Sequence, residues 1–110
     1  MKLLTPEMIE EETQKNPLVL YMKGTPLFPM DSNSAFVCQN LDLLGVSYLT
    51  FDLLKVKGRS ALEEKTKLKT APFLFAKGHF VGAGGALRTL FKTKDIEKLL
   101  IQFGLLIKNE

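Results

Sequence analysis

The first half of the chain alternates between helix-like and strand-like hydrophobic patterns. Thr5 followed by Pro6 and Glu7 has the composition of a helix start, with a capping hydroxyl, a proline in the first turn and a carboxylate beside it. That helix is predicted to run to about Lys15. The next apolar run, Leu18–Met22, has no polar position, which is typical of a strand buried on both faces.

A second helix is predicted over residues 34–44. Its apolar positions recur at helical spacing and it ends at Gly45, a residue common just after a helix. The stripe consists of Ala35, Val37, Cys38, Leu41 and Leu44. Residues 46–53 then alternate as a second strand, and residues 60–67 form a short polar helix.

The second half of the chain predicts a hairpin and two more helices. Residues 72–76 and 79–81 are apolar and are joined by the turn Lys77-Gly78. Helices follow over residues 86–91 and from about Thr93 onward. This order of elements predicts an α/β fold, in which a mixed sheet is covered by helices on both faces.

Length and composition change this picture little. The chain has 110 residues, of which 45% are hydrophobic and 25% charged, so a single domain over residues 1–110 is expected. Its net charge of +3 is spread along the chain, which does not favour nucleic acid, although lysines and Arg59 over residues 55–69 leave that alternative open. No apolar run is long enough for a membrane helix or a signal peptide. We expect a cytoplasmic protein, or an organellar-matrix one if a presequence has been removed.

Candidate chemistry is concentrated in the loop after the first predicted strand. This loop reads Lys23-Gly24-Thr25-Pro26-Leu27-Phe28-Pro29-Met30-Asp31-Ser32-Asn33-Ser34. Its glycine and prolines cannot continue a strand or a helix, and the polar residues 31–34 offer caps for the helix that follows. Two more blocks contain turn residues: Thr70-Ala71-Pro72, and the glycine-rich run from Gly78 to Phe91.

Together the three blocks resemble the monothiol glutaredoxins, most strongly over residues 16–106. In that family a Lys-Gly-Thr/Ser-Pro segment leads to Cys-Gly-Phe-Ser, a threonine precedes a cis-proline, and a Val-Gly-Gly-Cys/Ser-Asp segment opens a helix. The resemblance implies a thioredoxin-like fold of the glutaredoxin type with a four-stranded mixed sheet. It aligns Asp31 with the nucleophilic cysteine of the family.

The replacement at position 31 removes the sulfur that the family's reaction requires. A thiolate at a helix N-terminus attacks glutathione mixed disulfides or ligates iron. Asp31 keeps the negative charge only, so we expect no catalytic residue, no metal site and no [2Fe–2S] cluster. The one thiol, Cys38, lies on the apolar stripe of the second helix and is expected to be buried.

The resemblance also implies a residual glutathione groove. Its expected residues are Lys23, Arg59, Thr70, Ala71, Pro72, Gly84 and Gly85. Gly85 stands where the family has an aspartate that binds the ammonium group of glutathione, so one charge-assisted hydrogen bond of about 1.5–3 kcal/mol is missing. Glutathione is therefore expected as a weak ligand.

The main functional prediction from these residues is a redox-inactive, glutaredoxin-like binding or regulatory module. Its partner would meet the former groove and the loop around Leu27 and Phe28. The alternative is a glutathione-dependent monothiol glutaredoxin that acts in thiol redox or iron–sulfur cluster handling through Cys38 or Asp31.

Overall fold

A mixed four-stranded sheet forms the centre of the fold. The computed structural model describes residues 2–107, and its strands lie in the order β3 (Leu49–Asp52), β2 (Leu18–Met22), β5 (Phe73–Ala76) and β6 (His79–Ala83). β2 is parallel to β3 and antiparallel to β5, and β5 is antiparallel to β6. The expected α/β, thioredoxin-like sheet is thus confirmed.

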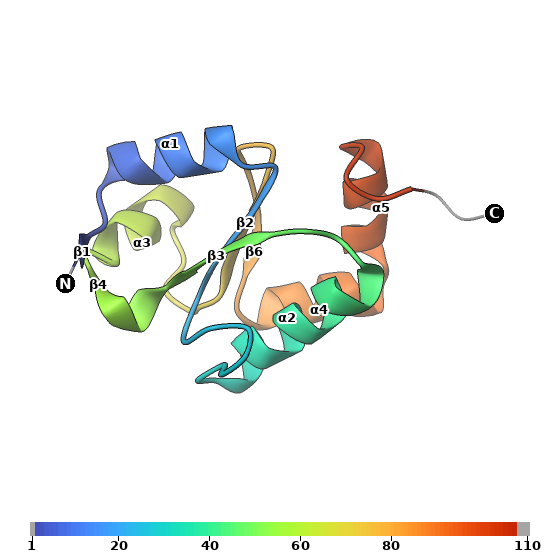
Figure 1. Ribbon diagram of the computed structural model, residues 1–110, viewed down its shortest axis with the longest axis horizontal. Coiled ribbons are helices and arrows are strands. Elements are labelled where there is room, and N and C mark those ends of the chain that lie inside the picture. Colours follow the sequence, from blue (N-terminus) through green and yellow to red (C-terminus); the bar gives the residue numbers. More distant parts are fainter. Residues whose placement is uncertain (1, 108–110) are drawn as a thin grey trace.

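Helices cover both faces of this sheet (Figure 1). On one face α1 (Pro6–Lys15) packs against α3 (Ser60–Thr66). On the other face α4 (Gly85–Lys92) packs between α2 (Ser32–Leu44) and α5 (Asp95–Gln102). The loop after β2 and the start of α4 therefore lie on the α2 side of the sheet.

The two hydrophobic cores follow directly from the period of β2. Side chains of a strand alternate between its faces, so Val19 and Tyr21 enter the core under α1 and α3, and Leu18, Leu20 and Met22 enter the other core. All five are at most 1% exposed. The absence of polar residues in β2 is therefore explained by helices on both sides.

Most predicted elements are found, with shifts at their ends. Thr5 caps α1 as expected, and its Oγ1 accepts a hydrogen bond from the Met8 amide at 3.2 Å. β3 starts three residues later than the predicted 46–53, and it ends at Asp52 because this residue accepts a hydrogen bond from the Leu54 amide at 2.9 Å and starts the 3₁₀ helix η1 (Leu53–Lys55). The sequence did not predict β1 (Lys2–Leu3) and β4 (Val56–Lys57), which pair in parallel.

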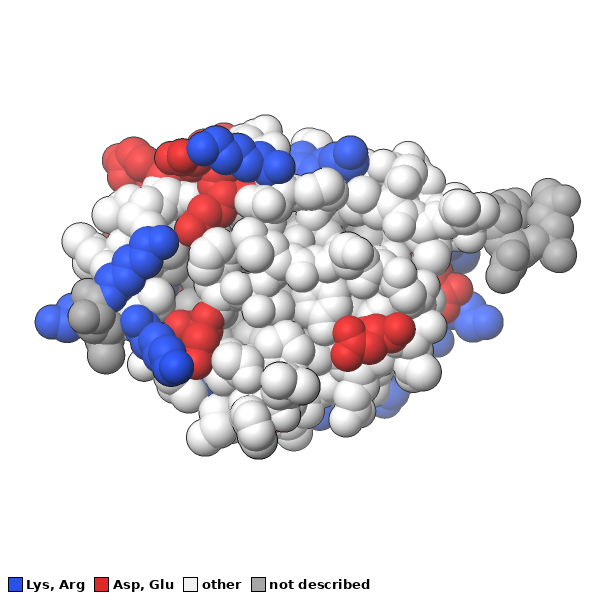
Figure 2. Space-filling view, viewed as in Figure 1, with Lys and Arg blue, Asp and Glu red and all other residues white. Residues whose placement is uncertain are grey.

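On the face seen in Figure 2 the charged side chains lie mainly over α1 and the β1–β4 end, with a further acidic group right of the centre. Blue and red side chains are interspersed over α1, where Lys15 pairs with Glu11 at 2.6 Å. Within the described part of the chain no helix is long and apolar enough to cross a bilayer. The assignment of all 110 residues to one domain stays a prediction.

Candidate functional site

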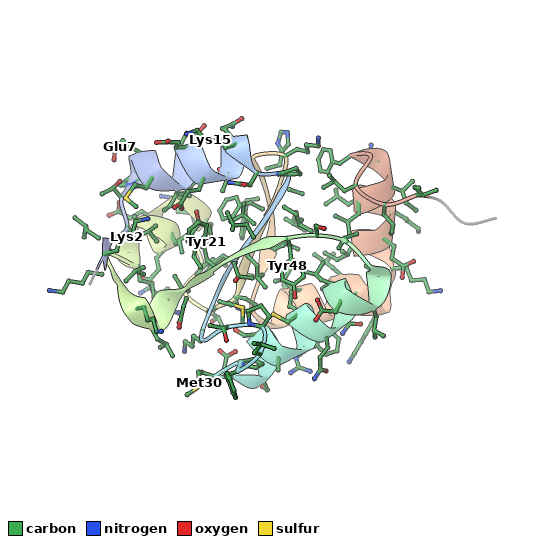
Figure 3. The ribbon with its side chains drawn as sticks, viewed as in Figure 1. Lys2, Glu7, Lys15, Tyr21, Met30 and Tyr48 are labelled. Carbon is green, nitrogen blue, oxygen red and sulfur yellow. The ribbon has the colours of Figure 1, made fainter. Side chains whose placement is uncertain are left out.

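The loop between β2 and α2 is closed by backbone hydrogen bonds. The Met30 amide donates to the Lys23 carbonyl at 2.9 Å, and Gly24 and Pro29 form an isolated antiparallel bridge. Between them Leu27 and Phe28 project outward, 86% and 75% exposed. Met30 also points away from the body at the end of this loop (Figure 3). The backbone is therefore ordered while its apolar tip is open to solvent.

Asp31 is the cap of α2, as the polar cluster after Met30 predicted. Its Oδ1 accepts a hydrogen bond from the Ser34 amide at 2.7 Å. A carboxylate is stabilised there by the free amide groups and by the helix dipole. The buried hydroxyl of Ser34 in turn accepts from the Lys23 amide at 3.2 Å, which joins the end of β2 to the start of α2.

The cis-proline segment and the glycine-rich turn lie against one another. The Ala71–Pro72 peptide is cis, as the resemblance implied, and the Pro72 carbonyl accepts from the Gly84 amide at 2.9 Å. Gly84 has φ +55°, and a Cβ on it would lie 2.8 Å from Thr70 Cγ2. Thr70, Pro72 and Gly84 are thereby brought together, with Gly85 exposed beside them.

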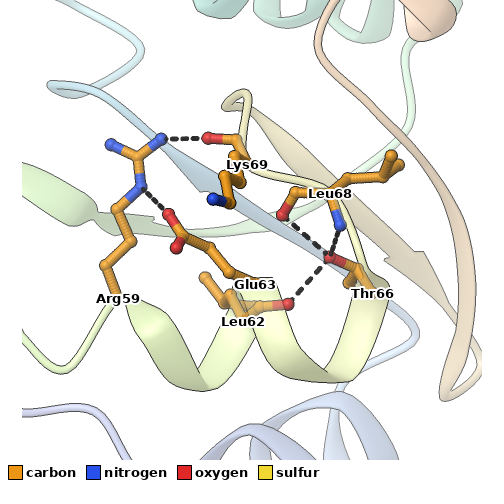
Figure 4. Close-up of polar contacts among 6 residues, drawn as sticks. All are labelled: Arg59, Leu62, Glu63, Thr66, Leu68 and Lys69. Carbon is orange, nitrogen blue, oxygen red and sulfur yellow. Dashed lines mark hydrogen bonds and ion pairs between the residues drawn. The ribbon is translucent and has the colours of Figure 1, made fainter.

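Arg59 lies next to the cis-proline segment but is already engaged within the chain (Figure 4). Its Nη2 donates to the Lys69 carbonyl at 2.7 Å, and its Nε lies 3.6 Å from Glu63 Oε2. The Thr66 hydroxyl donates to the Leu62 carbonyl at 2.8 Å within α3 and holds the turn after this helix by accepting from the Leu68 amide at 3.3 Å. Arg59 thus supports the segment before Thr70, and its role toward glutathione stays a prediction.

Sequence reasoning missed a polar contact between α2 and α4. Arg88 Nε donates to Asn33 Oδ1 at 2.7 Å, and the Arg88 guanidinium carbon lies 4.6 Å from the centre of the Phe36 ring. Asn33 is two residues from Asp31, and Arg88 is one turn beyond Gly84. The only signal in the sequence was an arginine on the helix after the glycines, which does not identify its partner.

Cys38 lies inside the core and apart from these groups. It is 2% exposed, and its Sγ lies 3.4 Å from Met22 Sδ. Burial raises the pKa of the Cys38 thiol, and the nearby Asp42 carboxylate acts in the same direction. A thiol that is both covered and held protonated is a poor nucleophile. The expectation that Cys38 is a buried apolar residue is confirmed.

The described residues hold no ready metal centre. Within residues 2–107 no three histidine, cysteine, aspartate or glutamate side chains come together in a way that would hold a metal ion. Asp31 is a single carboxylate at the N-terminus of α2, where it accepts from the Ser34 amide.

Similar proteins decide the family. No family model matches the chain. A monothiol glutaredoxin of Porphyra purpurea is 33% identical over 98 residues, covering 88% of this chain and 92% of the relative. A probable monothiol glutaredoxin 2 of Rickettsia typhi is 32% identical, covering 94% of both chains. The chain belongs to the monothiol glutaredoxin family. Mitochondrial monothiol glutaredoxin-5 of Schizosaccharomyces pombe is also 32% identical, over 87% of this chain and 68% of its own length.

Solved glutaredoxin structures agree with this assignment. A truncated, monomeric mutant of Trypanosoma brucei 1-C-Grx1 superposes with a TM-score of 0.79 at 27% identity, covering 97% of this chain and 98% of the other. A buckwheat glutaredoxin in complex with glutathione has a TM-score of 0.75 at 21% identity, over 92% and 94% of the two chains. At that identity the buckwheat protein supports the fold alone.

The main functional prediction from the sequence, a redox-inactive binding module, is wrong. Relatives at 32–33% identity that align over most of this glutaredoxin are monothiol glutaredoxins, and they favour the glutathione-dependent alternative. The prediction gave most weight to a set of lost side chains, with Asp31 and Gly85 among them, although it expected the backbone of the site to be kept. That backbone is in place, with the capped helix, the cis-proline and the Gly84 turn.

Proposed function

We propose that this monothiol glutaredoxin binds glutathione between the loop after β2, the cis-proline segment and the start of α4, and that it handles iron–sulfur clusters as cargo. The observation that carries the proposal is the placement of the two candidate ligands. The only thiol, Cys38, is 2% exposed, whereas the half-buried Asp31 carboxylate caps α2 at the position that the family gives to its cysteine.

Glutathione fits this groove through its peptide backbone and its carboxylates. Thr70 and the Pro72 backbone lie against Gly84, and Gly85 opens α4 beside them, so these residues form one continuous surface for the peptide. In this proposal Lys23 and Arg59 supply positive charge for the carboxylates of glutathione, with Arg59 bonded to the Lys69 carbonyl just before Thr70. A related glutaredoxin, from buckwheat, has been solved as a complex with glutathione.

Asp31 and the thiolate of bound glutathione together supply cluster ligands in place of the missing cysteine thiolate. Iron–sulfur clusters require soft sulfur ligands, and the thiolate of bound glutathione supplies one. Asp31 adds an oxygen ligand with the same single negative charge as the family's thiolate, so the charge of the ligand set is unchanged. Each chain contributes one Asp31 carboxylate and one glutathione thiolate. Because a [2Fe–2S] cluster takes four ligands, two chains would share it, and it would be released rather than held permanently.

The cluster proposal is tested by reconstitution with iron, sulfide and glutathione. We expect visible cluster absorbance that depends on glutathione and is absent with ophthalmate, the analogue in which an alkyl group replaces the thiol. Asp31→Ala should reduce cluster loading at least fivefold, while Asp31→Cys should preserve or raise it. No cluster in the wild-type protein under conditions where glutathione binds would refute this function.

Glutathione binding has a separate test at Gly85. A Cβ on Gly85 meets no atom within 4 Å, so an aspartate can be accommodated there. Gly85→Asp restores a charged acceptor for the glutathione ammonium group and should tighten binding roughly tenfold, equivalent to about 1.5 kcal/mol. The measurement is a titration followed by NMR shifts at Lys23, Thr70 and the residue at position 85.

Gly85→Asn is the matched control, because it has the same size without the charge and should change affinity less than threefold. Equal affinities for the aspartate and asparagine variants would contradict the proposed orientation of glutathione.

A cytoplasmic or organellar-matrix location is part of the same proposal, and two relatives are mitochondrial proteins.

A further inference from the structure

A pocket lies outside the glutathione groove, between the edge strand β6 and α5. Its volume is about 190 Å³, and its walls include Val81, Leu90, Ile96, Leu99 and Phe103. α5 stands beside the hairpin, at the end of the molecule away from β1 and β4 (Figure 1). Leu90 is near the C-terminal end of α4 whereas the groove is at its start, so the two sites are separated by roughly 8 Å along this helix alone.

The pocket has flat aromatic surfaces at one end. The His79 ring stacks on the Phe103 ring, with centroids 5.7 Å apart and planes only 3° from parallel. Phe80 also lines the pocket and is 37% exposed. Flat rings favour a planar apolar group, because aromatic side chains gain energy by stacking or by edge contacts with another ring.

One carboxylate lines the pocket as well. Asp95 Oδ2 accepts a hydrogen bond from the Thr93 hydroxyl at 2.7 Å. None of the three ion pairs found among residues 2–107 includes Asp95. Lys94 and Lys98 are near it in sequence, and all three side chains are exposed, so solvent screens their charges alike. A ligand cation at the rim would therefore find an acceptor.

We propose that this pocket, between β6 and α5, binds a small monocyclic aromatic amine, with the ring among the apolar side chains and the ammonium group at Asp95. The volume agrees with this class, since an apolar cavity of about 150 Å³ holds one benzene molecule. The additional volume accommodates a short amine-bearing substituent. The site is independent of glutathione and of Asp31.

The probe for this site is benzylamine, titrated into the full chain and followed by NMR. We expect saturable shifts at Val81, Leu90 and Leu99 with a dissociation constant on the order of 1 mM. Benzoate has a similar ring and the opposite charge, and it should bind about threefold more weakly, because an exposed ion pair contributes little. Asp95→Asn should remove this difference between the two probes.

Filling the pocket gives the second arm of the test. Leu99→Phe or Leu90→Phe should weaken benzylamine binding at least tenfold, and two positions are used because either variant alone could affect folding. Lys23→Gln, in the glutathione groove, should leave benzylamine binding unchanged. The proposal is overturned if the pocket residues show no saturable shift up to about 20 mM benzylamine, or if the shifts persist in folded, filled variants.

Discussion

Asp31→Cys is expected to raise glutathione-dependent reduction of a mixed disulfide at least tenfold over the wild-type protein. The residue at position 31 caps α2 and lies at the open N-terminus of that helix, where amide groups and the helix dipole stabilise a negative charge. A cysteine there would have a lowered pKa and an accessible sulfur. Cys38, in contrast, is 2% exposed and has a raised pKa.

The gain in reductase activity should come from the sulfur of the cysteine introduced at position 31. The thiolate introduced at position 31 would attack the glutathione sulfur of the mixed disulfide and displace the target protein's thiolate, and a second glutathione would then release the enzyme as oxidised glutathione forms. The assay is turnover of a glutathionylated peptide. Asp31→Ser is the matched control, because serine keeps a capping oxygen and lacks sulfur.

The double variant Asp31→Cys/Cys38→Ser separates the two thiols. It should keep the activity of Asp31→Cys, since Cys38 contacts Met22 in the core and not the groove. Activity that vanished in the double variant would locate the chemistry at Cys38 and contradict the geometry described above.

Replacing the carboxylate cap should also lower the free energy of unfolding by about 1 kcal/mol.

Gly24→Ala is expected to destabilise the protein by about 3 kcal/mol or more, the largest stability effect that we predict for the site. Gly24 has φ +86°, a region that residues with a Cβ rarely adopt. A Cβ on it would lie 2.3 Å from the Phe28 carbonyl oxygen and 2.9 Å from the Met30 amide nitrogen. Both obstacles are backbone atoms of the closed loop, so relief requires moving the loop.

Movement of this loop would also disturb the candidate site, because two hydrogen bonds link the loop to its neighbours. The Gly24 amide donates to Asp52 Oδ1 at 2.9 Å, and the Met30 amide, next to Asp31, donates to the Lys23 carbonyl. Gly24→Ala should therefore weaken glutathione binding as well as stability. Urea denaturation and the NMR titration measure the two effects separately.

Gly45→Ala provides the matched control for this prediction. Gly45 also has positive φ, +74°, but a Cβ on it meets no atom within 4 Å. Its cost should be only that of the backbone conformation, about 1 kcal/mol. If both variants lost the same stability, the close contact between Gly24 and the loop backbone would have no energetic weight.

Much of the fold is encoded by local patterns that a single reading of the chain can recognise. Thr5 and Asp31 cap the helices that follow them because a short polar side chain reaches an amide three residues on. β2 is apolar throughout because both faces are covered. The burial of Cys38 followed from its place on a helical stripe.

Site residues were predicted by type and region, and their partners were not. Arg59 was expected to face glutathione, and the structure engages it with the Lys69 carbonyl. The Arg88–Asn33 hydrogen bond joins residues 55 apart in sequence, and no periodicity links them. The function was misjudged because the substitutions at Asp31 and Gly85 were taken to outweigh the family resemblance, whereas relatives at 32–33% identity over most of the chain favour the glutathione-dependent alternative.

Local patterns of residue types predicted the helices and the central strands, because each depends on residues within a few positions of one another. The family resemblance came from three blocks spread over residues 16–106, one of which has aspartate instead of a thiol at position 31. The three-dimensional packing was needed to show where Arg59 and Arg88 bond, how Gly84 lies against Thr70, and that a pocket opens between β6 and α5. Those features depend on how distant segments pack in three dimensions, and side-chain packing is set by all of the neighbours at once.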